Sequence, residues 1–321
     1  MRIWMILIIT VAVMATVGCS LPNINLFPEA GPLKEVTLEG TGDEKILVLS
    51  IQGTISDLPK ERLLRTQPSM VQEVVSQLKR AEKDPLIKAV LMKVNSPGGT
   101  VTSSDILYHE IRSYKERSGI KLVVTMMNLA ASGGYYISLP SDWIMAHPTT
   151  ITGGIGVIFS RPGVTGFMEK LGLALHVSKS GELKDMGSPF RAPTETDKAI
   201  FQSLTDQMAQ RFINHVLEHR TLSADQRQRI ASGRIFLANE AQQLGLIDQI
   251  GYLSDAIEKA KSLAGLGPDA KVVTYRRYQP EDDNIYNPAV RQLDANGIKS
   301  TVLSAVQEAG FYYIWPAAVG Y

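Results

Sequence analysis

Residues 87–136 read IKAVLMKVNSPGGTVTSSDILYHEIRSYKERSGIKLVVTMMNLAASGGYY, and this stretch decides the fold class of the chain. Two β-rich apolar runs, residues 87–94 and 121–126, flank a segment in which we expect a helix that begins near Ser103 and ends near Glu116. Each run is continuously apolar, which is typical of parallel strands whose two faces are both covered. The stretch therefore predicts a strand–helix–strand unit of an α/β fold.

The same alternation of strands and helices continues on both sides of this stretch. We expect further strands at residues 45–51, 143–146, 173–177, 235–237 and 272–275. Helices are predicted from Val71 to the Asp84-Pro85 break, after Gly134, over residues 195–220, after Ser223, and over 239–244, 253–264 and 298–309. Residues 180–197 form a polar connection that is long for a compact domain, so we expect it to take part in function.

The composition is that of a folded globular protein and excludes several classes. Hydrophobic residues make up 44% and charged residues 20% of the 321 residues, unlike a disordered chain or a coiled coil. The 33 basic and 32 acidic residues give a net charge of +1, so no field of the whole protein attracts nucleic acid. The single Cys excludes an internal disulfide and a thiolate-rich zinc or iron–sulfur site.

The N-terminal segment has the features of an export signal. Arg2 precedes residues 3–17, which carry no charge and are fewer than the about 20 residues that a comfortable membrane-spanning helix needs. The small residues before Cys19 resemble a bacterial lipoprotein box, in which the cysteine is lipidated and becomes the new N-terminus. An uncleaved signal anchor is the alternative. Both predict a protein anchored to the membrane of the bacterial cell envelope, with its folded part outside the cytoplasm.

The sequence divides into four parts. Residues 1–19 form the signal peptide with the possible lipoprotein box, 20–42 a tether, 43–265 the folded domain, and 266–321 a C-terminal extension. The extension ends in GFYYIWPAAVGY, residues 310–321, which is apolar and aromatic and carries no charge. Such a segment lies on a membrane, in a groove, against a neighbouring protein or on its own domain, and the sequence leaves these alternatives open.

Two turns that follow predicted strands carry candidate catalytic groups. Residues 95–99, Asn-Ser-Pro-Gly-Gly, let the backbone approach a ligand with its N–H groups pointing outward, as an oxyanion hole requires. A tight turn without a ligand is the alternative. Ser132 lies among Ala and Gly residues at a strand-to-helix turn, which is the position of a nucleophile elbow, and a helix N-cap is the alternative.

A serine nucleophile needs a base to accept its proton. None of the five His residues lies in a suitable setting of small residues, so a lysine is the other choice. A lysine acts as a base only when burial lowers its pKa well below the usual value of about 10.4. Lys179 and Lys184 both lie at the polar connection, and the residues alone do not choose between them or exclude ordinary surface lysines.

Five ordered motifs point to a known family. They are Asn-Ser-Pro-Gly-Gly at 95–99, Ala-Ser-Gly-Gly-Tyr-Tyr at 131–136, Thr-Gly-Gly-Ile-Gly-Val at 152–157, Lys-Ser-Gly-x-x-Lys at 179–184 and Gly-Arg-Ile-Phe at 233–236. From about residue 45 to about residue 262 the chain resembles the signal peptide peptidase A family, serine peptidases of family S49, in its short form with one catalytic domain. This resemblance implies a ClpP/crotonase-like α/β fold of repeated ββα units with additional C-terminal helices.

The resemblance also implies a mechanism. Ser132 is then the nucleophile and Lys184 the general base, with the N–H groups of Gly98 and Gly133 as the oxyanion hole. The implied enzyme is a membrane-associated serine endopeptidase that cleaves apolar, extended peptides, such as signal-peptide remnants, through an acyl-enzyme. It needs no metal or cofactor. Family members form rings in which neighbours can complete sites, so a homo-oligomer is implied.

One residue departs from the family pattern. Gly154 stands where the family often has a serine, in Thr-Gly-Ser-Ile-Gly. If that hydroxyl helps to orient the lysine, another group must do so in this chain. Thr152 and Ser180 are the nearest candidates for this supporting role.

Three other functions compete with the peptidase. His215-Val-Leu-Glu-His219 has the metalloprotease spacing on a helix, but no third zinc ligand is identified. A catalytically inactive peptide-binding lipoprotein on the same fold is made conceivable by Gly154. An acyl-CoA enzyme of the crotonase type is disfavoured by the Ser-Gly-Gly elbow and the export signal.

Overall fold

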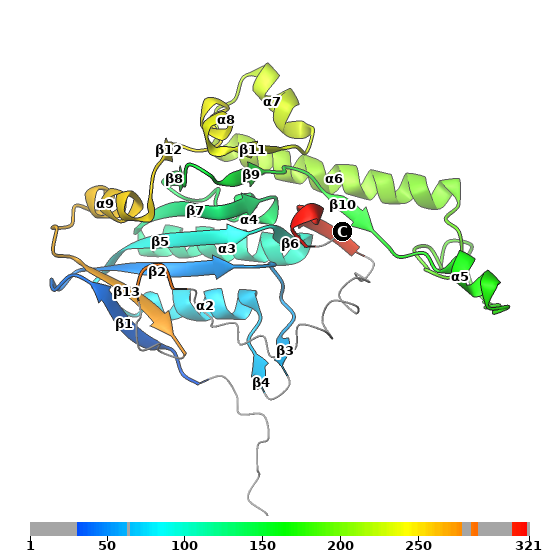
Figure 1. The fold of residues 1–321 in the computed structure, drawn as a ribbon, viewed down its shortest axis with the longest axis horizontal. Coiled ribbons are helices and arrows are strands. Elements are labelled where there is room, and N and C mark those ends of the chain that lie inside the picture. Colours follow the sequence, from blue (N-terminus) through cyan, green and yellow to red (C-terminus); the bar gives the residue numbers. More distant parts are fainter. Residues whose placement is uncertain (1–30, 63–64, 278–283, 288–309, 320–321) are drawn as a thin grey trace, which may run out of the picture.

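The computed structural model describes residues 31–62, 65–277, 284–287 and 310–319. A nine-stranded sheet forms the centre of these residues, with seven strands in the order β1-β13-β2-β5-β7-β8-β12 and β9 and β11 continuing from the end of β7 (Figure 1). Its strands are β1 (Lys34–Glu39), β2 (Lys45–Gln52), β5 (Ile87–Ser96), β7 (Lys121–Ala131), β8 (Trp143–Ala146), β9 (Ile151–Gly153), β11 (Ile235–Leu237), β12 (Gln249–Ile250) and β13 (Lys271–Arg276). The central pairs β2–β5, β5–β7 and β7–β8 are parallel, which confirms the predicted α/β class.

Helices cover both faces of this sheet, which explains why its strands are continuously apolar. On one face lie α2 (Met70–Ala81), α3 (Val101–Ser118) and the one-turn α4 (Gly133–Tyr136), and on the other lies α9 (Leu253–Ala264). Alternate residues of β2 divide between two cores: Leu47 and Leu49 pack with α2 and α3, whereas Ile46 and Val48 pack with α9. The predicted strand–helix–strand unit is therefore the centre of the molecule.

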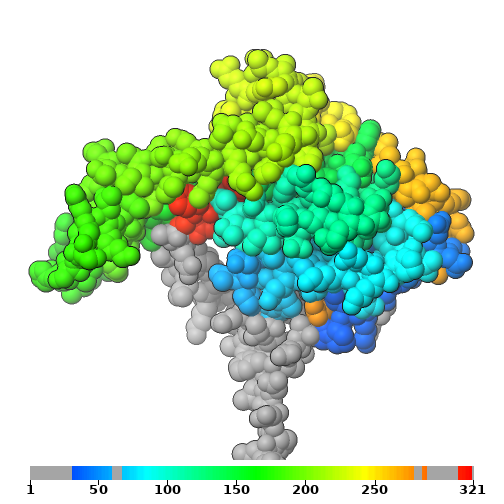
Figure 2. Space-filling view, turned by 180° about the vertical axis from the view of Figure 1, so that it is seen from behind, coloured from blue at the N-terminus to red at the C-terminus, as the bar shows by residue number. Residues whose placement is uncertain are grey.

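A long helix and a protruding segment lie beside the central sheet and the helices that cover it. The remaining helices are α5 (Thr165–Lys170), α6 (Glu195–His219), α7 (Ala224–Ala231) and α8 (Ala238–Gln243), and β3 (Lys60–Arg62) pairs with β4 (Arg65–Gln67). α6 begins at a capping box, in which the Thr194 hydroxyl accepts from the Asp197 N–H and the Asp197 carboxylate accepts from the Thr194 N–H. Residues 161–194, which we call the arm, carry α5 away from the body (Figures 1 and 2).

A second, three-stranded sheet joins distant parts of the chain. Its order is β10 (Ile158–Ser160), β14 (Gly310–Ile314) and β6 (Gly98–Thr100), and β14 is antiparallel to both neighbours. A 3-10 turn, η1 (Pro316–Ala318), follows β14. The apolar C-terminal segment thus lies on its own domain, one of the alternatives that the sequence left open, because two edge strands there offer free backbone groups.

Two expectations differ from the structure. Residues 173–177 form no strand, because Leu173, Leu175 and Val177 are all exposed and no described strand lies alongside to pair with them. Within the expected tether 20–42, Lys34–Glu39 form β1, which pairs with β13 of the C-terminal extension. The sheet therefore includes part of the expected tether and part of the expected C-terminal extension.

Several expected features lie outside the described residues. They include the export signal, Cys19 and the predicted helix at 298–309. Within the described part of the chain, no helix combines the length and the apolar character that crossing a membrane requires.

Candidate active site

Ser132 lies at the end of β7 in a strained conformation. Its φ is 53° and its ψ is −116°, and it is the only residue other than glycine with a positive φ in the described part of the chain. The strain is maintained by a 2.7 Å hydrogen bond from the Ser132 N–H to the Gly153 carbonyl. Although Ser132 is the N-cap residue of α4, its side chain makes no capping bond, and its buried Oγ has no hydrogen-bond partner. This is the geometry of a nucleophile elbow rather than of a simple cap.

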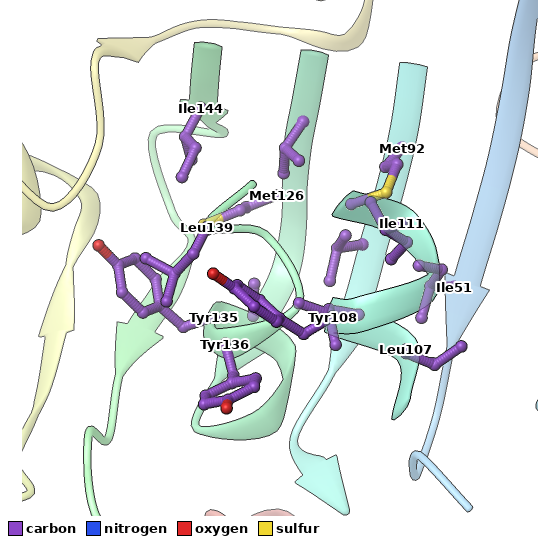
Figure 3. Packing of buried hydrophobic residues seen from close by; sticks show 14 of the residues in the cluster. Ile51, Met92, Leu107, Tyr108, Ile111, Met126, Tyr135, Tyr136, Leu139 and Ile144 are labelled. Atoms are coloured by element: carbon purple, nitrogen blue, oxygen red, sulfur yellow. The ribbon is translucent and has the colours of Figure 1, made fainter. Parts of the chain in front are cut away.

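Small residues around Ser132 allow this sharp turn, and two tyrosines anchor it. Ala130 lies between Ser96 of β5 and Thr152 of β9. Tyr135 and Tyr136 then turn into the core, where Figure 3 shows them with apolar residues of the sheet and α3. Their hydroxyls donate to the Leu246 carbonyl at 2.9 Å and to the Asp105 carboxylate at 2.6 Å, respectively. Burial, and then the Asp105 carboxylate, raise the pKa of Tyr136, so its hydroxyl stays a donor.

Gly98 and Gly133 lie against each other beside Ser132. A Cβ on Gly98 would lie 2.7 Å from the Gly133 nitrogen. Gly133 is the first residue of α4, so its N–H has no acceptor within the helix and is available to an oxyanion. The Gly98 N–H already donates to the Ser96 hydroxyl at 3.1 Å, and this hydroxyl in turn donates to the Gly53 carbonyl at 2.7 Å. In this structure the Gly98 N–H therefore points to Ser96, and it must leave this hydroxyl or share its proton with the oxyanion to act as the second expected donor.

A side chain at position 98 should damage this site. Gly98 has a φ of +99°, and a Cβ there would lie 1.9 Å from the carbonyl oxygen of Tyr313 in β14. We expect Gly98→Ala to lower kcat/KM at least about 100-fold, because it displaces an oxyanion donor and blocks the neighbouring strand. Activity assays and urea unfolding measure the effect.

Gly119→Ala is the matched control for this substitution. Gly119 also has a positive φ, of +65°, but a Cβ there meets nothing within 4 Å. It should lower the free energy of unfolding by about 1 kcal/mol through backbone strain and leave kcat/KM unchanged. Equal effects of the two substitutions on activity would contradict the assignment of Gly98.

Within one chain the structure does not bring Lys184 to Ser132. Lys184 lies exposed on the arm with Ser180, and its side chain has no hydrogen-bond or ion-pair partner among the residues described. Lys179, the alternative base, is held by the Asp185 carboxylate at 2.9 Å and by the Glu182 carbonyl at 2.8 Å. Both contacts hold the Lys179 amine on the arm. The structure thus leaves Lys184 as the unengaged lysine of the pair.

The two candidate supporting residues, Thr152 and Ser180, are also separated, because Ser180 lies on the arm whereas Thr152 lies in β9. Thr152 is buried near Ser132, and its hydroxyl donates to the Ala130 carbonyl at 2.6 Å. Gly154 has a φ of +63°, which favours glycine, and a Cβ there would lie 3.4 Å from the Ser132 nitrogen. Position 154, where the resemblance led us to expect a serine, thus lies next to Ser132.

The His-x-x-Glu-His motif takes part in packing. His215 contacts Glu218 through Nδ1 at 2.9 Å, and His219 Nε2 lies 2.8 Å from the Tyr108 hydroxyl. Burial lowers the pKa of His219, which favours the neutral ring. The described residues contain no group of three His, Cys, Asp or Glu side chains that could hold a metal ion.

A strained serine on a strand-to-helix turn, with an available N–H from the next residue, defines a serine hydrolase. Comparison with known families narrows this class: the description "Peptidase family S49" matches residues 114–267, and "Clp protease" matches residues 55–150. The chain belongs to Peptidase family S49 and is a serine peptidase with a mixed α/β, ClpP-like fold.

Individual relatives agree with this assignment. The chain is 39% identical to the "Putative signal peptide peptidase SppA" of Enterococcus faecium, over 80% of this chain and 75% of that protein. It is 37% identical to the "Putative protease MJ0651" of Methanocaldococcus jannaschii, over 60% of this chain and 61% of that protein. Among solved structures, a mutant of ClpP1 from Listeria monocytogenes matches 65% of this chain and 94% of its own, with 18% identity and a TM-score of 0.43.

Proposed function

We propose that this serine peptidase is a membrane-associated endopeptidase that cleaves apolar, extended peptides, such as signal-peptide remnants, with a Ser132/Lys184 dyad. The observation that carries the proposal is the strained, buried Ser132 with an unpartnered Oγ beside the Gly133 N–H. An extended segment already lies against this site as β14, which pairs with both β6 and β10, and this pairing supports recognition of an extended peptide. Backbone pairing of this kind recognises extended peptides with little regard to sequence.

The proposed reaction has two steps. Neutral Lys184 takes the Ser132 proton while Oγ bonds to the substrate carbonyl carbon, and the Gly133 and Gly98 N–H groups hold the oxyanion. The C–N bond then breaks and the proton passes from Lys184 to the leaving amine. In the second step Lys184 takes a proton from water, whose oxygen bonds to the acyl carbon. The bond between that carbon and Ser132 Oγ then breaks, and Lys184 returns the proton to Oγ as the carboxyl product leaves.

Lys184 reaches this site from a second copy of the chain in our proposal. The arm that carries it exposes large apolar side chains, among them Phe167 at 65%, Leu173 at 58% and Leu175 at 53% exposure. Exposed apolar patches of this kind are typical of interaction surfaces. A homo-oligomer in which each arm covers the neighbour's Ser132 would bury this surface, desolvate Lys184 and bring Ser180 to the same site.

Membrane association is proposed from the N-terminal segment. Lipidation of Cys19 or an uncleaved anchor would hold the catalytic domain outside the cytoplasm, next to apolar peptides left in the membrane. The relative from Enterococcus faecium carries the name of a signal peptide peptidase, which supports this substrate class. The fraction of the protein that sediments with membranes, with and without Cys19→Ser, tests the lipid anchor.

The pH dependence of cleavage tests the proposed base. Because the acting lysine must lose a proton, we expect kcat/KM for a quenched apolar peptide to rise from pH 6 toward pH 10. A flat profile would contradict a lysine base. Labelling by a fluorophosphonate probe without turnover of any of several apolar peptides would instead favour the inactive peptide-binding alternative.

A further inference from the structure

Two buried hydroxyl groups have no hydrogen-bond partner in the described part of the chain, and both lie beside Gly133. They belong to Ser132 and Ser104. Ser132 precedes Gly133 in the sequence, whereas Ser104 belongs to α3, which contacts both α4 and β6 (Figure 1). The proposed mechanism uses the hydroxyl of Ser132 and leaves that of Ser104 without a role.

Ser104 Oγ lies close to both expected oxyanion donors. A Cβ on Gly133 would lie 2.5 Å from Ser104 Oγ and 3.0 Å from the Gly98 Cα. A Cβ on Gly98 would in turn lie 2.7 Å from the Gly133 nitrogen. The Ser104 hydroxyl, Gly98 and the Gly133 N–H therefore border the same small space.

The start of α3 does not need the Ser104 hydroxyl as a cap. Thr100 is the N-cap residue, and its hydroxyl accepts from the Ser103 N–H at 3.2 Å. The Ser103 hydroxyl donates to the Asp57 carboxylate at 2.7 Å. Both of these hydroxyls are thus engaged where the helix begins, and that of Ser104 is not.

The Ser104 hydroxyl also lacks the bond that is usual for a serine within a helix. Such a serine often donates to the carbonyl four residues earlier. Ser118 of the same helix does so, with the Tyr114 carbonyl at 2.7 Å. Ser104 makes no such bond to Thr100, and its hydroxyl lies against Gly133 instead.

The stability of the fold does not account for a serine at position 104. Burying an unpartnered hydroxyl is destabilising, because the group loses its bonds to water without replacement. Alanine would fill almost the same space, carries no polar side-chain atom and has the highest helix propensity. A hydroxyl that gains its partner only while a substrate reacts does account for the serine, because it then stabilises the transition state more than the ground state.

The oxyanion hole has room for such a donor. The Gly133 N–H is available, but the Gly98 N–H donates to the Ser96 hydroxyl at 3.1 Å. Oxyanion holes combine backbone N–H groups with side-chain donors, serine hydroxyls among them. Because a hydroxyl rotates about its C–O bond, that of Ser104 can direct its proton to a new acceptor without a movement of the helix.

We infer that the Ser104 hydroxyl donates a hydrogen bond, together with the Gly133 N–H, to the oxyanion that forms when Ser132 attacks the substrate carbonyl. This inference rests on the proposed peptidase function and adds a catalytic residue to it. Ser104 keeps its proton throughout, and the proton of Ser132 still passes to Lys184. The negative charge develops only as the substrate reacts, so the contribution of Ser104 belongs to kcat rather than to KM.

Ser104→Ala in the full chain tests this role. We expect kcat for a quenched apolar peptide to fall about 100-fold, the loss typical of one oxyanion donor, while KM changes less than about threefold. The pH profile of kcat/KM should keep its wild-type shape, because Ser104 takes no part in proton transfer. The variant should unfold at the same urea concentration as wild type or at a higher one.

Ser103→Ala is the matched control. Ser103 is adjacent and equally buried, but its hydroxyl is bonded to Asp57. Its loss should lower the urea concentration at which the protein unfolds and leave kcat within about threefold of wild type. The two variants should therefore show opposite patterns of stability and activity.

A peptide trifluoromethyl ketone tests the oxyanion contact without turnover. When Ser132 Oγ bonds to the ketone carbon, its proton passes to the base and the ketone oxygen becomes the anion. The inhibition constant of the ketone should rise about 100-fold in Ser104→Ala, whereas that of the corresponding alcohol, which forms no such bond, should not change. An inhibition constant does not depend on the amount of folded enzyme.

Four outcomes would overturn the inference. If Ser104→Ala keeps kcat within about threefold of wild type while Ser132→Ala is inactive, Ser104 has no such role and the peptidase stands. Equal weakening of the ketone and the alcohol, or unfolding of Ser104→Ala at a lower urea concentration, would show that the hydroxyl supports the structure instead. Cleavage that survives Ser132→Ala would refute the proposed mechanism, and the inference with it.

Discussion

Ser132→Ala should lower kcat/KM for an apolar peptide at least about ten-thousandfold, because the proposed attacking oxygen is lost. The effect should lie in kcat, because the attacking oxygen is needed in the chemical step. The fold should not be disturbed, because Ser132 Oγ makes no hydrogen bond that the substitution would remove. Single-turnover kinetics and labelling by a fluorophosphonate probe measure it. The variant should unfold at the same urea concentration as wild type, because the backbone strain is unchanged.

Ser138→Ala is the matched control for this experiment. Ser138 is also buried and follows α4, but its hydroxyl donates to the Gly134 carbonyl at 2.8 Å, away from the proposed chemistry. Its loss should lower the free energy of unfolding by about 1 kcal/mol and leave kcat/KM within about twofold. Cleavage that persists in Ser132→Ala and stops with EDTA would instead direct attention to His215 and His219.

Lys184→Met should be the second large effect, with kcat/KM lowered at least about a thousandfold because the base is lost while the alkyl chain remains. Lys179→Met is the control that separates the two lysines of the motif. The Lys179 amine forms an ion pair with Asp185, so replacing Lys179 should destabilise the arm and reduce activity only modestly. Loss of activity only in Lys179→Met would show that the base is misassigned.

Mixing two inactive variants tests whether the base comes from a neighbour. Ser132→Ala and Lys184→Met chains, co-assembled in equal amounts, should recover about a quarter of wild-type activity, because a random site then has both intact groups in one case of four. A single chain that supplied both groups would give no recovery. The oligomeric state of each variant, measured by light scattering, shows whether mixed assemblies form.

Features of the fold that depend on local burial can be predicted well from the sequence. The apolar runs in β2, β5, β7 and β8 are continuous because the sheet is covered on both sides, so the order of strands and helices follows from the pattern alone. The elbow at Ser132 is equally local, since a run of Ala and Gly residues is what permits its strained backbone. The distinction between Lys179 and Lys184 is not local: it depends on an ion pair with Asp185 that neither motif nor spacing reveals.

The two expectations that differ from the structure also depend on contacts that are distant in the sequence. Leu173, Leu175 and Val177 alternate like a strand, yet no described partner strand lies beside them, and a strand is stable only when paired. β1 lies in a stretch with turn-forming residues and gains its order from pairing with β13, far away in the sequence.

By itself, then, the sequence determined the α/β class and the strand-to-helix turn at Ser132, because burial and backbone strain leave local patterns of residue type. Only the tertiary structure decided that the C-terminal strand pairs with β6 beside Gly98 and that Lys184 lies apart from Ser132 in one chain. These arrangements join residues that are distant along the chain, and such contacts are set by the closure of the whole fold, which leaves no periodic signal in the sequence.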